Sequence, residues 1–240
     1  MGNSLMADLR HAFTDSAGVY AATGCFVAFE GGEGAGKSTQ SRLLRDHLLT
    51  EGYDVVATHE PGDTAVGQQL RRIVLDPATG RISHRTEALL YAADKAEHVD
   101  RVVAPALARR AVVLTDRYVD STLAYQGAGR DLPDRELERV ARWATGDLRP
   151  HLTVLLDLPP QQGLTRFEGR DRIEGESAEF HERVREMFLQ LAGGAPEHYL
   201  VIDARLPVAE IAGAILARLR PLLGQATRTA APLAPTRGAE

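Results

Sequence analysis

The chain has 240 residues, of which 44% are hydrophobic, and its formal net charge is -5 at pH 7. This length predicts one α/β domain with a sizeable core and excludes two domains of comparable size. The negative charge disfavours a general nucleic-acid surface, and without a run of 18 apolar residues or a basic-then-apolar leader we expect neither a membrane partner nor export.

Short apolar runs alternate along the chain with longer segments of helical character. Strands are expected at 26–29, 54–57, 112–115, 153–158 and 199–202, and helices at 37–49, 67–75, 86–109, 134–144, 178–191 and 208–222. This alternation predicts an α/β fold with a mostly parallel five-stranded sheet flanked by helices. Because ligands of such sheets bind beyond the carboxyl ends of the strands, polar residues just after a strand are the candidates for a site.

The two ends of the chain are expected to be peripheral to this domain. Residues 1–22 precede the first expected strand and are interpreted as an N-terminal extension of a domain that spans 23–223. Residues 224–240 are rich in Ala, Pro, Thr and Gly, which predicts a disordered tail. The single cysteine, Cys25, falls inside the first strand and indicates core filling in a protein of the reducing cytoplasm.

A glycine-rich segment separates the first expected strand from the first expected helix. Glycine at 31 and 36, followed by Lys37 and Ser38, is typical of a phosphate-binding loop, whose backbone N–H groups point at phosphate oxygens while the lysine adds a movable cation. Ser38 would then hold Mg²⁺. A flexible turn that binds nothing is the alternative, but the flanking strand and helix favour nucleoside triphosphate binding. The expected ATP-binding residues are Gly31, Gly32, Glu33, Gly34, Ala35, Gly36, Lys37, Ser38 and Thr39.

A carboxylate and a guanidinium follow the third expected strand, as Asp116 and Arg117. Asp116 at this edge of the sheet can bind the Mg²⁺ of a nucleotide, directly or through water. The alternative is a helix N-cap, with Arg117 paired to a surface acid. Asp157 competes for the metal role, but it ranks second because Pro159 and Pro160 then begin a helix, which suits a structural cap.

Two further sets of charges have a functional and a structural interpretation. Arg71, Lys95 and Arg117 could together bind a second anionic ligand, although each alone would be an ordinary surface charge. The stretch 171–174, preceded by Arg166 and Arg170, could supply mobile arginines that close over a transferring phosphoryl group. Its alternative is an exposed loop of mutually screened ion pairs.

These segments, in this order, resemble the thymidylate kinase family of nucleoside monophosphate kinases, which phosphorylate dTMP. The similarity runs from about Cys25 to Leu222 and is carried by the segments 29–39, 60–62, 86–94, 116–127 and 171–174. A P-loop alone identifies only a superfamily, whereas the stretch from Asp-Arg-Tyr to Tyr-Gln-Gly and the Glu-Pro-Gly turn are specific to this family. The resemblance implies a P-loop fold of the nucleoside monophosphate kinase type.

The resemblance also implies roles for residues in an acceptor site. Glu33 would face the 3′-hydroxyl of the sugar or the metal, and Tyr91 would stack on thymine. Tyr125 would lie under the sugar where a ribose 2′-hydroxyl would otherwise fit, which favours deoxyribose. The remaining implied dTMP ligands are Arg71, Lys95 and Arg117 around the phosphate and base, and Thr122 and Gln126 at the base edge.

The catalytic arginines of this family lie either in the P-loop or in a lid. Because Ala35 stands where the loop arginine would be, the lid at about 166–177 is expected to supply Arg170 and Arg172, beside Lys37 and Arg117.

The chain departs from the family pattern at four positions, namely Lys95 for arginine, His59 for arginine, Asp63 for glycine and Tyr91 for phenylalanine. Lysine keeps the charge but loses the two-pronged geometry, so acceptor binding is expected to be weaker or less selective. An acid at Asp63 is unfavourable beside phosphates unless it points away.

The function that follows from the resemblance is Mg²⁺-dependent transfer of the γ-phosphoryl group of ATP to dTMP, giving dTDP in dTTP biosynthesis. The alternatives are a kinase for another nucleotide or nucleoside, and a non-catalytic nucleotide-dependent switch. The resemblance further implies a homodimer, whereas the net charge and the single cysteine predict a cytoplasmic protein without a nucleic-acid partner.

Overall fold

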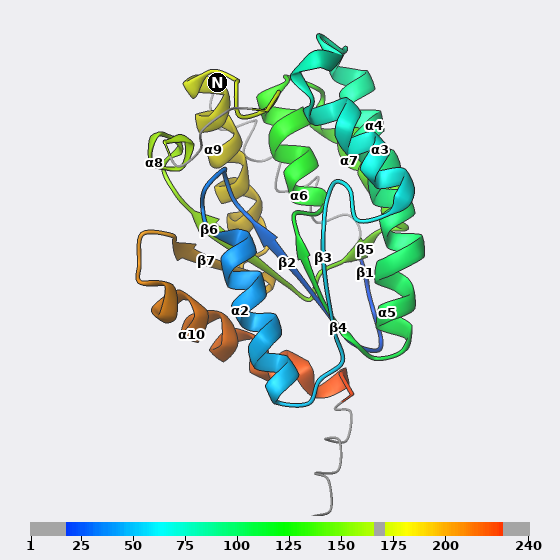
Figure 1. Ribbon diagram of the computed structural model, residues 1–240, viewed down its shortest axis with the longest axis vertical. Helices are drawn as coiled ribbons and strands as arrows, with labels where there is room; N and C mark the ends of the chain where they lie inside the picture. Colours follow the sequence, from blue (N-terminus) through cyan, green and yellow to red (C-terminus); the bar gives the residue numbers. More distant parts are fainter. Residues whose placement is uncertain (1–17, 166–170, 228–240) are drawn as a thin grey trace, which may run out of the picture.

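The computed structural model describes residues 18–165 and 171–227, and its centre is a five-stranded parallel sheet (Figure 1). The strand order across the sheet is β3-β4-β2-β6-β7. Every neighbouring pair is parallel, as the alternating strands and helices of the sequence predict. The strands are β2 (Cys25–Glu30), β3 (Val55–His59), β4 (Val112–Asp116), β6 (Leu152–Asp157) and β7 (Tyr199–Asp203).

Helices cover both faces of this sheet and form a separate layer beyond its carboxyl end (Figure 1). Helices α2 and α10 pack on one face, whereas α5 and α9 contribute to the other. Helices α3 and α4 pack against each other beside the carboxyl ends of the strands. The helices are α2 (Lys37–Thr50), α3 (Ala65–Leu75), α4 (His84–His98), α5 (Ala104–Ala108), α6 (Val119–Thr122), α7 (Asp134–Thr145), α8 (Pro160–Leu164), α9 (Ala178–Gly194) and α10 (Val208–Leu219).

The core explains why the strands read as unbroken apolar runs. Along β2, Val27 and Phe29 pack with α2 and α10, while Phe26 and Ala28 pack with α5 on the opposite face. Successive side chains of a strand point to opposite faces, so a sheet covered on both sides needs apolar residues at every position. All six residues of β2 are buried.

The expected helix at 86–109 is interrupted in the structure. Helix α4 passes into a π-helical segment, η2 (Val99–Val103), before α5 begins. Pro105 stands at the start of α5, and because proline has no N–H, regular α-helical hydrogen bonding cannot run through this point. The apolar period continues across the π turn, which is why the sequence pattern reads as one helix.

A helical stretch that the sequence pattern did not predict carries several site residues. Helix α6 continues into the π-helical segment η3 (Leu123–Gly129), so residues 119–129 are helical throughout. Nearly all of η3 is buried, and its composition is rich in Gly and Ala. A segment buried on every side shows no amphipathic period, so the usual sequence signal is lacking.

A two-residue strand pair and two backbone hydrogen bonds attach both ends of the described chain to the rest of the domain. Strand β1 (Val19–Tyr20) pairs with β5 (Leu148–Arg149), Gly24 N donates to Gln225 O at 3.1 Å, and Thr227 N donates to Arg110 O at 3.0 Å. These residues fall partly in the ranges interpreted as extension and tail, and the rest of those ranges, 1–17 and 228–240, lies outside the described residues. Within the described ranges, none of the helices combines the length and apolarity needed to cross a membrane.

Candidate active site

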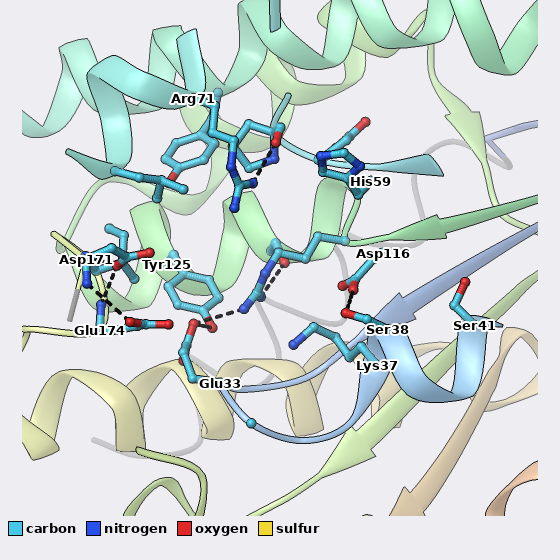
Figure 2. Close-up of a pocket in the computed structure, with 18 of the residues that line it drawn as sticks. Glu33, Lys37, Ser38, Ser41, His59, Arg71, Asp116, Tyr125, Asp171 and Glu174 are labelled. Atoms are coloured by element: carbon cyan, nitrogen blue, oxygen red, sulfur yellow. Dashed lines mark hydrogen bonds and ion pairs between the residues drawn. The ribbon is translucent and has the colours of Figure 1, made fainter. Parts of the chain in front are cut away.

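A cavity of about 740 Å³ opens where the carboxyl ends of β2 and β4 meet the layer of α3 and α4 (Figure 2). The P-loop and the start of α2 form one wall, and α3 and α4 form the opposite wall. The cavity therefore brings together most of the residues expected at the site. Those that line it are Glu33, Gly34, Gly36, Lys37, Ser38, Thr39, Arg71, Tyr91, Lys95, Asp116, Arg117, Thr122, Tyr125 and Gln126.

The P-loop has the backbone shape that its glycines allow. Gly31 has a φ of 133° and Gly36, the N-cap of α2, has a φ of 93°, and both values are unfavourable for residues with a Cβ atom. A Cβ atom at Gly31 would also collide with the carbonyl oxygen of Leu156. The loop thus curls over the N-terminus of α2, where backbone N–H groups favour anions.

Lys37 bends back over this loop. Its Nζ donates to the carbonyl oxygens of Gly31 at 3.0 Å and Gly32 at 2.8 Å. Burial, reinforced by the nearby positive charge of Arg117, lowers the pKa of Lys37 from its usual 10.5 to about 8. An arriving phosphate would add negative charge beside Lys37 and so favour its charged form.

Ser38 and Asp116 meet at the metal position expected from the sequence. Ser38 Oγ donates to Asp116 Oδ2 at 2.6 Å (Figure 2). Among the described residues there is no cluster of three or more His, Cys, Asp or Glu that could hold a metal. A pair of oxygen donors fits Mg²⁺, which takes few protein ligands and completes its shell with water and substrate phosphates.

Arg117 is held between the P-loop and η3. Its guanidinium donates from Nη2 to Glu33 Oε1 at 2.9 Å and from Nη1 to Ser121 Oγ at 3.1 Å, and its Cζ lies 4.9 Å from the centre of the Tyr125 ring. Tyr125 Oη also donates to Glu33 Oε1, at 2.6 Å. Arg117 has a φ of 71°, a conformation rare for residues with a Cβ atom. Rigid support on several sides fixes where this cation points.

His181 on α9 completes the surroundings of Glu33, and the sequence offered no signal for it. Its Nδ1 lies 3.4 Å from Glu33 Oε2. Although burial alone would raise the pKa of Glu33, the contact with His181 and the charges of Arg117 and Lys37 hold it well below its usual value. Glu33 is therefore ionised at neutral pH.

Glu30, the last residue of β2, is a second carboxylate at the site, and the sequence pattern did not identify it as a candidate. It is fully buried and accepts hydrogen bonds from Tyr118 N at 2.8 Å and from Ser121 N and Oγ at 3.2 and 2.6 Å. Burial and the neighbouring Asp120 raise the pKa of Glu30 to about 7. Its hydrogen bonds fix the backbone turn from which Arg117 projects.

The wall formed by α3 and α4, called the acceptor wall below, contains three of the implied dTMP ligands, Arg71, Tyr91 and Lys95. Arg71 extends into the cavity and donates to Pro61 O at 2.7 Å (Figure 2). Lys95 is only 2% exposed and its Nζ lies 2.8 Å from Glu60 Oε2. The buried Oγ1 of Thr122 has no hydrogen-bond partner among the described residues, so a polar ligand atom in the cavity could satisfy it.

Gln126 and Arg172 both contact Glu87, a buried acid on α4. Gln126 Nε2 donates to Glu87 Oε1 at 3.1 Å, Arg130 Nε donates to the same atom at 3.0 Å, and Arg172 Nη2 donates to Glu87 Oε2. Arg172 Nε also donates to Val74 O at 2.9 Å. The structure thus attaches Arg172 to the acceptor side, and it is not among the residues that line the cavity.

The remaining charged residues singled out in the sequence do not gather at one point of the cavity. Arg166 and Arg170 lie outside the described residues, while Asp171 Oδ1 caps the next turn by accepting from Ile173 N and Glu174 N, each at 2.8 Å. Asp157, the competing metal candidate, is engaged by Arg185 through two hydrogen bonds of 2.7 and 3.0 Å. Asp63, which stands where the family usually has glycine, contacts Thr58, and its Oδ1 lies 3.4 Å from His59 Nδ1.

Comparisons with known proteins agree on one family. The family model described as "Thymidylate kinase" matches residues 29–215. Thymidylate kinases of Cutibacterium acnes and Clavibacter michiganensis subsp. michiganensis are each 54% identical to this chain, over 202 and 205 residues; both alignments cover 84% of the chain, and 99% and 97% of the relatives. The crystal structure of thymidylate kinase from Ehrlichia chaffeensis aligns with a TM-score of 0.69 at 28% identity, covering 82% of this chain and 99% of that one.

Proposed function

The chain belongs to the thymidylate kinase family and is an ATP-dependent dTMP kinase, and on that premise we propose how its described residues divide the binding of the two nucleotides. The reaction moves the γ-phosphoryl group of ATP to the 5′-phosphate of dTMP and yields ADP and dTDP, a step of dTTP biosynthesis. The observation that carries the division of roles is the continuity of one cavity from the P-loop to α3 and α4.

The P-loop side binds ATP. Lys37 exchanges its contacts with the Gly31 and Gly32 carbonyls for phosphate oxygens, and the backbone N–H groups of residues 31–39 surround the β-phosphate. Ser38 and Asp116 are the residues that would hold Mg²⁺, which when bound neutralises charge on the phosphates.

Transfer itself needs charge control more than acid–base chemistry. The accepting phosphate oxygen of dTMP is already anionic at neutral pH, so a bond forms from it to the γ-phosphorus as the bond to the bridging oxygen of ADP breaks. Arg117 lies between the two walls and counters the repulsion of the two nucleotides. In the same role we place the lid arginines Arg170 and Arg172, the second of which would have to leave Glu87 to reach the phosphates.

The acceptor side binds dTMP. Arg71, Lys95 and Arg117 face its phosphate and base, Tyr91 stacks on thymine, and Thr122 and Gln126 bind the base edge. Tyr125 and Glu33 face the sugar, which would place the Tyr125 ring against a ribose 2′-hydroxyl. The unpartnered hydroxyl of Thr122 supports this assignment, because a base edge supplies the missing hydrogen bond.

Parallel incubations with ATP, Mg²⁺ and dTMP, dUMP, dCMP, dGMP or AMP test the function. Rapid formation of dTDP with little of the other diphosphates is expected. Diphosphate formed chiefly from another acceptor would point to a related kinase. ATP binding with slow hydrolysis and no diphosphate from any acceptor would point to a nucleotide-dependent switch.

We infer that the protein is a homodimer in solution that associates through the outer surface of α3 and α4. These helices expose Val66, Ile73 and Leu89, which are 48%, 41% and 59% exposed. Exposed apolar residues on neighbouring helices favour association. Light scattering should give twice the mass of the chain, and Ile73→Glu with Leu89→Glu should give the monomer mass, whereas a monomeric unmodified protein would contradict the inference.

The compartment proposed for the protein is the cytoplasm, without a nucleic-acid partner. The net charge of -5 and the single, buried cysteine support this proposal. Fractionation of cells that produce the protein, followed by immunodetection, tests it.

A further inference from the structure

A buried chain of polar contacts connects Asp63 at the rim of the site with Lys95 in the acceptor wall. Lys95 Nζ lies 2.8 Å from Glu60 Oε2, and Glu60 Oε1 lies 2.7 Å from His98 Nδ1. On the other side of the imidazole ring, His98 Nε2 lies 2.7 Å from Thr58 Oγ1, which also contacts Asp63 Oδ2. Lys95, Glu60 and His98 are each at most 3% exposed.

The contacts come from two elements that the fold presses together. Thr58 belongs to β3, and Glu60 and Asp63 belong to the turn after it. Lys95 and His98 are three residues apart on α4, so they share one helix face. This series of polar contacts joins Asp63 and Lys95, two of the positions at which the sequence departs from the family pattern.

The number of hydrogens available decides the charge of His98. Thr58 has a single hydroxyl hydrogen and the Asp63 carboxylate has none, so Thr58 donates to Asp63 and its oxygen accepts from His98 Nε2. The Glu60 carboxylate can also only accept, so His98 Nδ1 must carry a hydrogen too. An imidazole ring with hydrogens on both nitrogens is a cation.

Placing the additional proton on one of the carboxylates fits the surroundings less well. Glu60 has the Lys95 ammonium at its second oxygen, and although burial alone would raise its pKa, the charges of Lys95 and His98 hold that pKa below its usual value. Asp63 has a side chain one-third exposed to water and 3.4 Å from His59, so water can solvate its charge.

One more titratable group borders the cluster. Asp94, also on α4, accepts a hydrogen bond from Gly62 N at 3.0 Å through Oδ1. Burial and the nearby Glu60 raise the pKa of Asp94. The Asp94 carboxyl group is directed at the Gly62 backbone, whereas Glu60 and Asp63 are the carboxylates linked to His98, directly and through Thr58.

We propose that His98 is a positively charged positioning residue that shares the Glu60 carboxylate with Lys95, so that Glu60 neutralises the Lys95 ammonium only partly toward the acceptor nucleotide. If His98 were neutral, Lys95 and Glu60 would cancel and the acceptor wall would lose attraction for an anionic nucleoside monophosphate. The arrangement also accounts for Asp63, whose charge is directed at Thr58 and the His98 cation. This inference rests on the acceptor role proposed above for Lys95.

The protonation of His98 can be observed directly on the full, ligand-free chain with ¹⁵N-labelled histidine. Long-range ¹H–¹⁵N correlation spectra at neutral pH should show hydrogens on both ring nitrogens, with His98→Gln identifying the signals. A neutral ring would overturn the proposal.

Steady-state kinetics separate positioning from general damage. His98→Gln should raise the KM for dTMP about tenfold while kcat and the KM for ATP stay near their original values. His47→Gln, at an exposed position near the end of α2, is the matched control and should change neither KM.

Lys95→Met distinguishes failure of this inference from failure of the proposed acceptor site. If Lys95→Met raises the KM for dTMP and His98→Gln does not, the role of His98 is wrong while that of Lys95 stands. If neither variant changes this KM, the acceptor role of Lys95 is wrong and the inference falls with it. An increase in both supports the inference.

Discussion

Ser38 Oγ, in the first turn of α2, donates a 2.6 Å hydrogen bond to Asp116 Oδ2, at the end of β4, although the two residues are 78 positions apart in the sequence. The contact exists because β2 and β4 are parallel neighbours, so the P-loop after β2 and the polar residues after β4 emerge at the same edge of the sheet. These two oxygen atoms can move apart and bind a cation between them.

Asp116→Asn should weaken the response to Mg²⁺. The substitution keeps the size of the side chain and a contact with Ser38 but removes the charge, so the Mg²⁺ concentration for half-maximal activity should rise about 10- to 100-fold. The measurement is activity against free Mg²⁺ at saturating ATP. Asp157→Asn, at the competing carboxylate that Arg185 engages, is the matched control and should leave the titration unchanged. The reverse result would move the metal site to Asp157.

ATP binding should weaken as the pH rises above 8. Burial lowers the pKa of Lys37 to about 8, so above that pH the free protein holds a neutral amine that must take up a proton to face phosphate. The dissociation constant of ATP should then rise by up to about tenfold per pH unit. Calorimetry in two buffers of different ionisation enthalpy measures both affinity and proton uptake.

Lys37→Arg is the control for this pH dependence, because arginine stays charged throughout the range. This variant should bind ATP more weakly but with little dependence on pH between 8 and 10. An ATP affinity that is constant with pH in the unmodified protein would refute the explanation.

Tyr125→Leu should relax the preference for deoxyribose. The ring of Tyr125 is packed between the Arg117 guanidinium and the aromatic rings of Phe180 and Phe188, and leucine would leave room beside the sugar. The ratio of kcat/KM for dUMP over UMP should fall about tenfold. Tyr125→Phe keeps the ring and loses only the hydrogen bond to Glu33, so it should retain the preference. Equal ratios in both variants would contradict the role of the ring.

Glu30→Gln should gain stability relative to the unmodified protein as the pH rises. The pKa of Glu30 is raised in the folded state from its usual 4.5 to about 7, so its stabilising contribution is full below pH 4.5 and is lost as the pH rises through 7. Glutamine does not titrate. The difference in unfolding free energy between the two proteins, from urea denaturation at several pH values, should shift in favour of the variant between pH 4.5 and 7. A constant difference would show that Glu30 ionises normally.

Glu87→Gln should destabilise the fold by about 3 kcal/mol, because it leaves two arginines without their buried counterion. The side chain of Glu87 is 1% exposed and contacts Arg130 and Arg172. Urea denaturation measures the loss. Glu97→Gln is the matched control on the same helix, since Glu97 pairs with the exposed Arg101 and should cost under about 1 kcal/mol. Similar losses in both variants would mean that the buried cluster contributes no more than a surface pair.

Much of the fold was predictable because its signals are local. All five strands of the main sheet lie within two residues of their expected bounds, since a strand covered on both faces must be apolar along its length. The helical segment η3 and the β1–β5 pair were not predicted, because a buried helical stretch has no amphipathic period and two-residue strands have no signal of their own.

By itself, the sequence determined the phosphate-binding loop, the parallel sheet, the family and the residue types at the site. The spacing of Gly31, Gly36, Lys37 and Ser38 is a property of one continuous segment, so it can be read without coordinates. Only the tertiary structure decided which charges meet. It brought His181 to Glu33 and His98 to Glu60, and it attached Arg172 to Glu87, because these partners come from elements far apart in the chain. Charge and protonation at such points depend on burial and on the partners within hydrogen-bonding distance, which no local pattern encodes.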